Sequence, residues 1–311
     1  MFKNLRELIS TMPDEKACRD YLAKERWNGV IICPYCQHDK CYVIENGKRF
    51  KCASRECYQK FSVVTGTIMG ASNLPVSKWL MAIYILTSSK KGISSYQLGR
   101  QIGTSQQSAW FMLHRIRLMM KNRANTLLSG IVEADETYLS RKYRSDYKGL
   151  PPEEIDYNMK NKVKNKGAVI AMAERGGEVR VKAMFDNNAE NVWQAINENV
   201  KPVSELHTDE SRLYKNDEQP YNIKHVTHYK REWVKGNVHV NTVENFWSVM
   251  KRGVYGIYHH ISYKHLQRYA DEYSYRYNSR KITDAERFTI SLQNIEHRLT
   301  YNELIGKKIN Q

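Results

Sequence analysis

Three carboxylates that lie far apart along the chain are the residues best suited to chemistry. Asp135 lies in the alternating segment IVEADETYLS, which predicts a strand, and Asp209 ends a second predicted strand. Glu244 lies in HVNTVENFWSVMKRG, which predicts a helix. Side chains from two strands and a helix can meet only in a folded domain. Carboxylate oxygens gathered in this way suit Mg²⁺ or Mn²⁺, and a two-metal site suits in-line displacement at phosphorus.

Helical periodicity places Asn241 and Lys251 on the same face of the predicted helix as Glu244. We therefore expect Lys251 to neutralise a phosphate beside the carboxylates, and Asn241 to hydrogen-bond there. The alternative for Lys251 is a solvated cation near a helix end. The alternative for Asp135 and Asp209 is a strand-end carboxylate that caps a turn.

Four neighbouring polar residues receive other interpretations. Glu133 is expected to share the strand face of Asp135, as a supporting or substitute ligand, because strand side chains alternate. Glu136 then points to the other face and is interpreted as structural. His207 and His239 flank the predicted site in sequence and are interpreted as hydrogen-bonded residues rather than ligands.

The charge of the chain is strongly basic and uneven. Its 311 residues contain 49 Lys and Arg against 33 Asp and Glu, for a net charge of +16. Residues 1–124 carry 20 basic against 8 acidic residues, whereas the remainder carries 29 against 25. This excess predicts that the N-terminal part contacts nucleic acid. A basic surface that serves only solubility is the alternative.

Membrane and export signals are not recognisable in the sequence. No apolar run approaches the ~20 residues that cross a bilayer, and the first residues lack the apolar core of a signal peptide. We therefore expect a cytoplasmic protein without membrane contact. Its six cysteines are then expected to be reduced or bound to metal rather than paired in disulfides.

Four of the cysteines have the spacing of a structural zinc site, with a CxxC pair followed by a wider CxxxxC pair. They are Cys33, Cys36, Cys52 and Cys57. The segment between the pairs predicts a hairpin that turns at Asn46–Gly47, which completes the layout of a zinc ribbon. Cys41 or His38 remains open as a substitute ligand, and four reduced core cysteines are the alternative. Cys18 is interpreted as a small buried residue on the preceding helix.

Residues 74–121 predict helices, two of which resemble a helix-turn-helix. The patterns Ser94–Gln97 and Thr104–Gln107 each predict a capping box that opens a helix, with Gly103 in the turn. The second helix would read base edges with its N-terminal residues Ser105, Gln106, Gln107 and Ser108. Phosphate contacts are predicted for Arg115 and Arg117, followed by Lys121 and Arg123. A helical bundle without DNA contacts is the alternative.

The C-terminal half changes to an alternation of strands and helices. Three strands, a helix, two strands and a helix predict a ribonuclease H-like α/β domain, with a mixed five-stranded sheet and flanking helices. The stretch 140–167 lacks periodicity and is predicted to be a loop or insertion. The expected domains are an N-terminal helical segment, a zinc ribbon, a helix-turn-helix-like domain, a catalytic domain and a C-terminal helical tail. Their ranges are 1–28, 29–66, 67–125, 126–285 and 286–311.

Several motifs together resemble the DDE transposases of bacterial insertion sequences that carry an N-terminal zinc ribbon. They include the ribbon cysteines with FSVVTGTIM, the segment KWLMAIYILTSSKKGISSYQLGRQIG, and the motifs EADETY, HTDESRLY and NTVENFWSVMKRGVYGIYHHIS. The resemblance implies an integrase-like fold, terminal inverted-repeat DNA as substrate, and DNA cleavage with strand transfer. It implies Mg²⁺ or Mn²⁺ at the acidic triad Asp135, Asp209 and Glu244, with Lys251 beside them. The wide CxxxxC pair departs from the family pattern, and Asn241 is notable because some relatives use Asn or His as the third member.

Two other functions remain open from the residues. A non-enzymatic DNA-binding regulator would combine the ribbon and the helix-turn-helix with a relic catalytic domain. A ribonuclease H-type nuclease would cut RNA–DNA hybrids without an end sequence. On the transposase interpretation the partners are double-stranded DNA ends and target DNA, and a homodimer or higher oligomer is expected because two ends must be held together.

Overall fold

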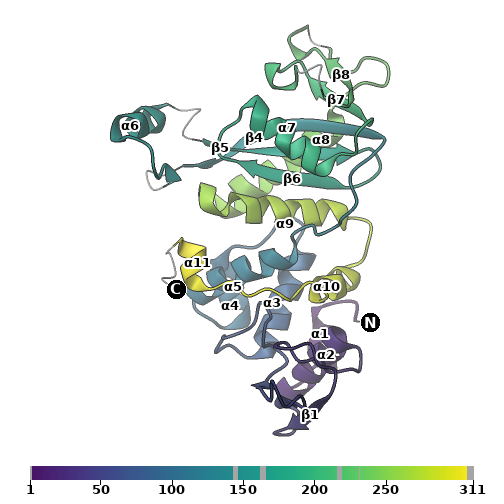
Figure 1. Ribbon diagram of the computed structural model, residues 1–311, viewed down its shortest axis with the longest axis vertical. Helices are drawn as coiled ribbons and strands as arrows, with labels where there is room; N and C mark the ends of the chain where they lie inside the picture. The colour runs from purple at the N-terminus through teal and green to yellow at the C-terminus, as the bar shows by residue number, and fades with distance from the viewer. Residues whose placement is uncertain (1, 143–145, 162–165, 216–218, 231, 307–311) are drawn as a thin grey trace. The chain divides into compact units, whose positions relative to one another are not determined.

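The computed structural model describes residues 2–142, 146–161, 166–215, 219–230 and 232–306 (Figure 1). The chain divides into two compact units. Unit 1 consists of residues 1–120 together with 281–311, and unit 2 consists of residues 121–280. In the described part of the chain, no helix is long and apolar enough to cross a membrane.

Unit 1 is built around one buried helix. The N-terminal helices are α1 (Leu5–Thr11) and α2 (Glu15–Trp27), and the central helices are α3 (Val76–Ser88), α4 (Ser95–Ile102) and α5 (Gln106–Met119). The side chain of Asp14 caps α2 by accepting a hydrogen bond from the backbone of Ala17. Helix α3 buries side chains on most of its circumference, as expected of an apolar helix at the centre of a bundle.

The ribbon forms a small three-stranded antiparallel sheet, β1 (Cys41–Ile44), β2 (Arg49–Cys52) and β3 (Lys60–Phe61). Its first turn contains Asn46 and Gly47 with φ of 52° and 77°, as the sequence predicted, because these residue types tolerate the left-handed region. The rings of Phe50 and Phe61 pack against Trp27 of α2 with centroid distances of 5.0 and 6.1 Å. These contacts join the ribbon to the helix before it.

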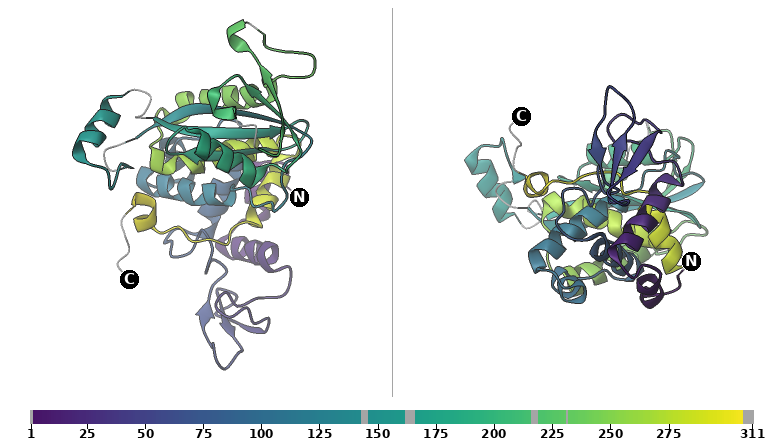
Figure 2. Two further views of the ribbon diagram at one scale, coloured as in Figure 1. Left: turned by 45° about the horizontal axis from the view of Figure 1, so that its top comes forward. Right: turned by 90° about the horizontal axis from the view of Figure 1, so that it is seen from below.

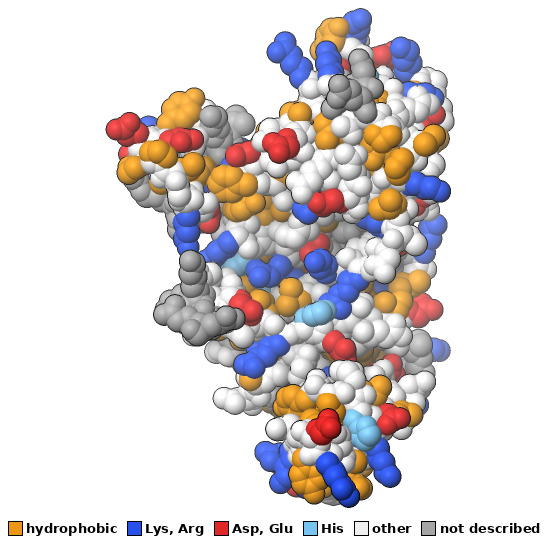
Figure 3. Space-filling view, viewed as in Figure 1, with side chains coloured by type: hydrophobic (Ala, Val, Ile, Leu, Met, Phe, Trp, Pro, Cys, Tyr) orange, Lys and Arg blue, Asp and Glu red, His pale blue; other side chains and the backbone are white. Residues whose placement is uncertain are grey.

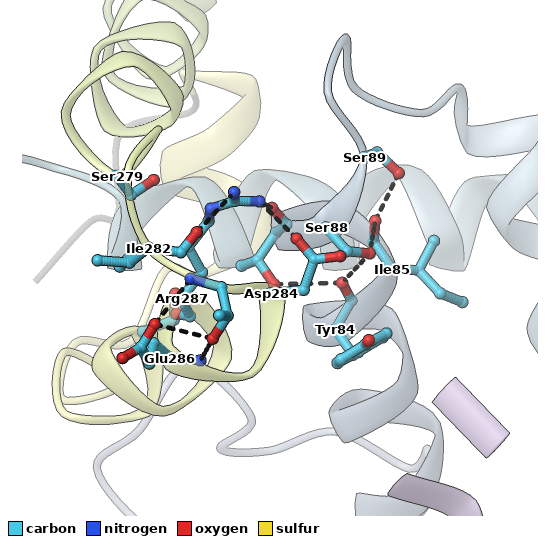
Figure 4. A network of polar contacts seen from close by, with 12 residues as sticks. Tyr84, Ile85, Ser88, Ser89, Ser279, Ile282, Asp284, Glu286 and Arg287 are labelled. Atoms are coloured by element: carbon cyan, nitrogen blue, oxygen red, sulfur yellow. Dashed lines mark hydrogen bonds and ion pairs between the residues drawn. The ribbon is translucent and has the colours of Figure 1, made fainter. Parts of the chain in front are cut away.

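The C-terminal segment is part of unit 1. It contains helices α10 (Asp284–Leu292) and α11 (Tyr301–Ile305), and the structure describes it up to residue 306. The Arg287 guanidinium donates hydrogen bonds to the carbonyls of Ile282 (3.0 Å) and Thr87 (3.4 Å), which ties α10 to the end of α3 (Figure 4). The ring of Phe288 lies 5.2 Å from that of Phe2. Residues 286–306 of the predicted tail therefore pack into the N-terminal unit.

Unit 2 contains a mixed five-stranded sheet in the order β6–β5–β4–β7–β8. Strands β4 to β6 are antiparallel, and β7 and β8 continue parallel to β4. The strand bounds are β4 (Ile131–Arg141), β5 (Lys166–Glu174), β6 (Val179–Met184), β7 (Glu205–Asp209) and β8 (Asn222–Val226). The two hydrophobic cores lie on opposite faces, because consecutive strand residues alternate between them.

Helices cover both faces of this sheet (Figures 1 and 2). Helix α7 (Ala189–Asn199) packs on the face that carries Val132 and Ala134. Helices α8 (Asn241–Gly253) and α9 (Leu266–Asn278) pack on the face that carries Leu139. The predicted ribonuclease H-like architecture, preceded by a zinc ribbon, is therefore confirmed.

One helix lies inside the stretch predicted to be a loop. Helix α6 spans Pro152–Lys160, within the range 140–167, whereas β4 extends to Arg141 and β5 begins at Lys166. Pro152 occupies the first helical turn and Glu153 and Glu154 follow it, an arrangement that favours a helix start. The loop prediction was therefore wrong for these residues, because end signals rather than periodicity mark this helix.

Candidate active site and zinc site

Strand pairing brings Asp135 and Asp209 together. Strands β4 and β7 are parallel, with Glu133 opposite His207. Continued by two residues along both strands, this register would bring Asp135 opposite Asp209, and the charge of Asp209 does act on the pKa of Asp135. Both residues keep the face of Glu133 and His207, because the step is an even number of residues. This is the face covered by α8.

The third predicted carboxylate, Glu244, lies close enough to Asp135 to act on its charge. Burial, together with the smaller effects of the negative charges of Glu136, Asp209 and Glu244, raises the pKa of Asp135 to about 7. Asp209 and Glu244 act on this pKa from a separate strand and a helix. The structure thus brings Asp209 and Glu244 within electrostatic reach of Asp135.

The three carboxylates form an open arrangement rather than a closed cluster. Among the described residues, the four ribbon cysteines are the only potential metal-binding group whose ligand atoms all lie within 4.8 Å of one another. Asp135, Asp209 and Glu244 are each partly accessible to solvent. An open set of hard oxygen donors at a solvent-reachable edge fits Mg²⁺ or Mn²⁺, which retain waters and leave positions for phosphate oxygens.

Glu133 attaches the first turn of α8 to the sheet. Its Oε2 accepts hydrogen bonds from the backbone of Thr242 (2.7 Å) and Val243 (3.3 Å), and its Oε1 accepts one from the Thr242 hydroxyl (2.9 Å). Glu133 is fully buried. It satisfies backbone donors that a helix start leaves unpaired, and its charge opposes the positive end of the helix dipole. We call this contact the Glu133 clamp.

Arg175 extends the clamp into a buried polar network. Its Nε donates to Glu133 Oε1 (2.9 Å) and its Nη2 donates to His207 Nδ1 (3.1 Å). His207 therefore carries its proton on Nε2, which donates to Glu205 Oε1 at 2.6 Å, because a guanidinium can only donate. Nδ1 of His239 lies 3.3 Å from Glu133 Oε1. His207 is thus hydrogen-bonded, as predicted, whereas His239 Nδ1 makes no hydrogen bond among the described residues. The role of Arg175 had no signal in the sequence.

Glu136 points to the opposite face of the sheet, as the alternation predicted. It accepts hydrogen bonds from the Tyr214 hydroxyl and from Asn187 Nδ2 (3.5 Å). Burial raises the pKa of Glu136, although the hydrogen bonds from Tyr214 and Asn187 act in the other direction. Its partners keep it on the α7 side of β4, away from the face shared by Asp135 and α8.

The four predicted zinc ligands lie together in the ribbon. The Sγ atoms of Cys33 and Cys57 are 3.8 Å apart, and those of Cys36 and Cys52 are 3.6 Å apart. Thiolates about 2.3 Å from a zinc ion in a tetrahedron have sulfur–sulfur edges of about 3.8 Å, so the observed distances fit structural zinc. Cys41 lies outside the group, and its Sγ contacts the carbonyl of His38 at 3.8 Å.

Comparison with known proteins finds two family models that match separate segments of the chain. Residues 13–60 match the family model described as a transposase zinc-ribbon domain, and residues 127–278 match the ISXO2-like transposase domain. The chain is also 26% identical over 255 residues to an "Uncharacterized protein in transposable element ISH50" from Halobacterium salinarum. That alignment covers 78% of this chain and 84% of the relative.

This chain belongs to the insertion-sequence transposases with an N-terminal zinc ribbon. The four cysteines lie within the matched ribbon, and the three carboxylates lie within the matched transposase domain. The helices α3 to α5 of the transposase fall between the two matched segments.

Replacement of Cys52 by Ser is expected to abolish zinc binding by the transposase, because the fully buried Sγ of Cys52 is one of four ligands. Mass spectrometry of elemental zinc should find about one zinc ion per wild-type chain and almost none in the variant. The variant ribbon should also become sensitive to proteolysis within 29–66. Cys41→Ser is the matched control and should retain the metal. Equal zinc loss in both variants would contradict the assignment.

Lys251 and Asn241 lie on α8 of the transposase with Glu244. Lys251 is partly exposed in the last turn of the helix, whereas Asn241 is exposed at its first residue. A partly exposed lysine on this helix is able to reach a phosphate, and its assignment to the active site stays a prediction.

Helices α4 and α5 of the transposase form a tight helix-turn-helix-like corner. Gly103 has a left-handed φ of 62°, and a Cβ on Gly99 would lie 2.9 Å from the carbonyl of Thr104. The cap of α5 is Ser105, which accepts from the backbone of Ser108 (3.2 Å), so the prediction of Thr104 as the cap was wrong by one residue. The four predicted base-reading residues, Ser105 to Ser108, thus lie at the start of α5.

The two arginines predicted to reach phosphates are buried. Arg115 and Arg117 are only 3% and 1% exposed. Arg115 donates hydrogen bonds to the carbonyls of Gly70 (3.0 Å) and Leu299 (3.0 Å), and so joins α5 to the C-terminal segment. The prediction of phosphate contacts was therefore wrong for both. Other cations are exposed nearby, and Figure 3 shows lysine and arginine side chains on the ribbon surface at the bottom of the view.

Proposed function

We propose that this transposase binds the terminal inverted repeats of its element and catalyses metal-dependent DNA cleavage and strand transfer. The observation that supports this proposal is that the charges of Asp209 on β7 and Glu244 on α8 both act on Asp135 of the central strand β4. Family membership indicates the class of reaction, and the three carboxylates are the proposed site of that reaction.

The central position of Asp135 suits it to hold two ions, while Asp209 and Glu244 would hold one each. Divalent ions bound there would lower the pKa of an attacking water or 3′-hydroxyl and stabilise the leaving 3′-oxygen. Asp135 has a pKa of about 7, so at neutral pH a proton competes with cations for this carboxylate. Lys251 would contact a phosphate beside them. Cleavage by water and joining by a 3′-hydroxyl are both direct displacements at phosphorus, so neither a protein nucleophile nor ATP is required.

DNA recognition is proposed for the start of α5. Ser105 and Gln107 are exposed there, whereas Gln106 is half-buried and its Nε2 donates to the Ser95 hydroxyl at 2.9 Å. Exposed serine and glutamine side chains at a helix start can contact base edges in the major groove. Each of the two element ends needs its own copy of this helix, so we propose that the protein acts on DNA as a homodimer or higher oligomer.

A strand-transfer assay with labelled element-end DNA and Mg²⁺ tests the proposed chemistry. Asp209→Asn and Glu244→Gln should each lower the rate by about a hundredfold or more, since ion-mediated charge stabilisation is worth several kcal/mol. Glu190→Gln removes an exposed carboxylate in the first turn of α7 and should leave the rate unchanged.

The same assay separates the alternatives. DNA binding that is independent of Mg²⁺ and yields no product would support a non-catalytic regulator. Cleavage of RNA–DNA hybrids without an end sequence would support a ribonuclease H-type nuclease. Undiminished strand transfer by Asp209→Asn or Glu244→Gln would overturn the assignment of the acidic triad.

A further inference from the structure

A cleft of about 550 Å³ lies in unit 2 where β4 approaches its end. Its walls come from the end of β4, the end of α6, the start of β5 and the segment that follows α8. Its lining includes Ser140, Arg141, Lys160, Lys166, Tyr255 and His259. This cleft is separate from the carboxylate edge, yet it is built on the same strand and is continuous with the same helix.

The charge of the cleft has one sign. Arg141, Lys160 and Lys166 are exposed and line it together with His259 and His260, and none of the described residues in its lining is acidic. Three elements contribute the three permanent cations. Such a surface attracts an anion that extends across several side chains, as a nucleic-acid strand does.

The wall after α8 has an unusual backbone. Residues Val254–Tyr258 form a π-helical turn, and His259 follows with a left-handed φ of 56°. Single π-helical turns and positive φ values at non-glycine residues occur often at functional sites. The turn leaves the ring of Tyr255 59% exposed. A large exposed ring beside cations can stack on a base.

One residue of the lining, Ser140, carries an unpaired polar atom. Ser140 is 5% exposed, and its Oγ has no hydrogen-bond partner among the described residues. Buried hydroxyls are normally hydrogen-bonded, so this wall of the cleft is not fully satisfied by the chain itself.

The cleft lies at a short distance from the carboxylates. Leu139 follows Asp135 by four strand residues, or about 13 Å, and Tyr255 follows Glu244 by eleven residues, or about 16 Å along a helix. A strand with stacked bases rises about 3.4 Å per nucleotide, so four or five nucleotides span this distance.

We infer that this cleft binds an unpaired DNA strand that leads away from the phosphate undergoing reaction. This inference rests on the proposed function, which supplies DNA as the substrate, and it adds a second DNA-binding site on the protein. The backbone phosphates contact Arg141, Lys160 and Lys166, and a base stacks on Tyr255. A double helix fits less well, because a cavity of this size does not admit it and its bases are not free to stack on a tyrosine.

Binding of a short fluorescein-labelled single-stranded oligonucleotide to the full-length protein tests this inference. Fluorescence anisotropy with EDTA removes catalysis from the measurement. Tyr255→Ala and the double variant Lys160→Glu/Lys166→Glu should each weaken binding by about tenfold, the range expected for loss of one stacked base or of phosphate contacts. The double variant should also show a smaller salt dependence of binding. Binding of a blunt duplex should change less than twofold, by the same stacking argument.

Matched controls separate the site from general charge effects. Tyr229→Ala removes another exposed tyrosine of unit 2, and Lys201→Glu reverses another exposed lysine. Equal losses in these controls, or equal losses for duplex and single strand, would overturn the inference. If the wild-type protein cleaves DNA but the cleft variants bind single-stranded DNA as well as the wild type does, the proposed function stands and the assignment of the cleft is wrong. Selective single-strand binding without any cleavage would support the cleft and contradict the proposed function.

Discussion

Asp135→Asn is expected to stabilise the metal-free transposase while it abolishes strand transfer. The folded protein raises the pKa of Asp135 from 3.8 to about 7. Between these values the folded state binds a proton that the unfolded state has released. This proton therefore favours folding at low pH, and the contribution is lost as pH rises through about 7. An asparagine of similar shape avoids burial of a charge beside two other carboxylates.

Thermal unfolding in EDTA at several pH values measures this effect. Near pH 8 the variant should melt higher by a few degrees, on the order of 5 °C, whereas near pH 4 the two proteins should differ little. Mg²⁺ should raise the melting temperature of the wild type and should raise that of Asp135→Asn much less, because a ligand is missing. Glu190→Gln, an exposed carboxylate, should follow the wild type. A variant that melts lower than the wild type near pH 8 would contradict this expectation.

Glu133→Ala is expected to cost about 3–5 kcal/mol of unfolding free energy, the range for loss of one partner from a buried ion pair. The substitution leaves the partly exposed Arg175 without its carboxylate and removes the acceptor of the Thr242 and Val243 amides. Chemical denaturation measures the loss. Glu198→Gln is the matched control, because its pair with Lys182 is on the surface, and should cost less than about 1 kcal/mol.

Glu133→Gln separates positioning from folding. The amide keeps the shape of the side chain and one acceptor oxygen, so the protein should remain folded. Hydrogen exchange of the Thr242 and Val243 amides should nevertheless accelerate, and strand transfer should need more Mg²⁺, because Glu244 follows the clamped residues directly. Slow exchange at these amides and an unchanged Mg²⁺ requirement would show that the clamp does not position Glu244.

The sequence predicts most local elements of this protein correctly. Alternation in the segment that became β4 predicted both the strand and the faces of Asp135 and Glu136, because strand geometry has a period of two. The paired cysteines predicted the ribbon, because short spacings hold thiolates near one another whatever the rest of the chain does. The residues that mark where helices begin were less clear. The cap of α5 was therefore misplaced by one residue, and α6 was interpreted as a loop.

Partners that are distant in sequence carried no such signal. Glu133 and Thr242 are 109 residues apart, and Arg115 reaches a carbonyl 184 residues away. The two arginines were therefore interpreted as surface cations, although packing against the C-terminal segment buries Arg115. Residue types and short spacings revealed which groups were able to do chemistry and which elements carried them. Only the folded chain established which carboxylates face one another, which one holds a helix in place, and which cations remain in water. These properties depend on strand register and burial between distant segments, and local spacing does not encode them.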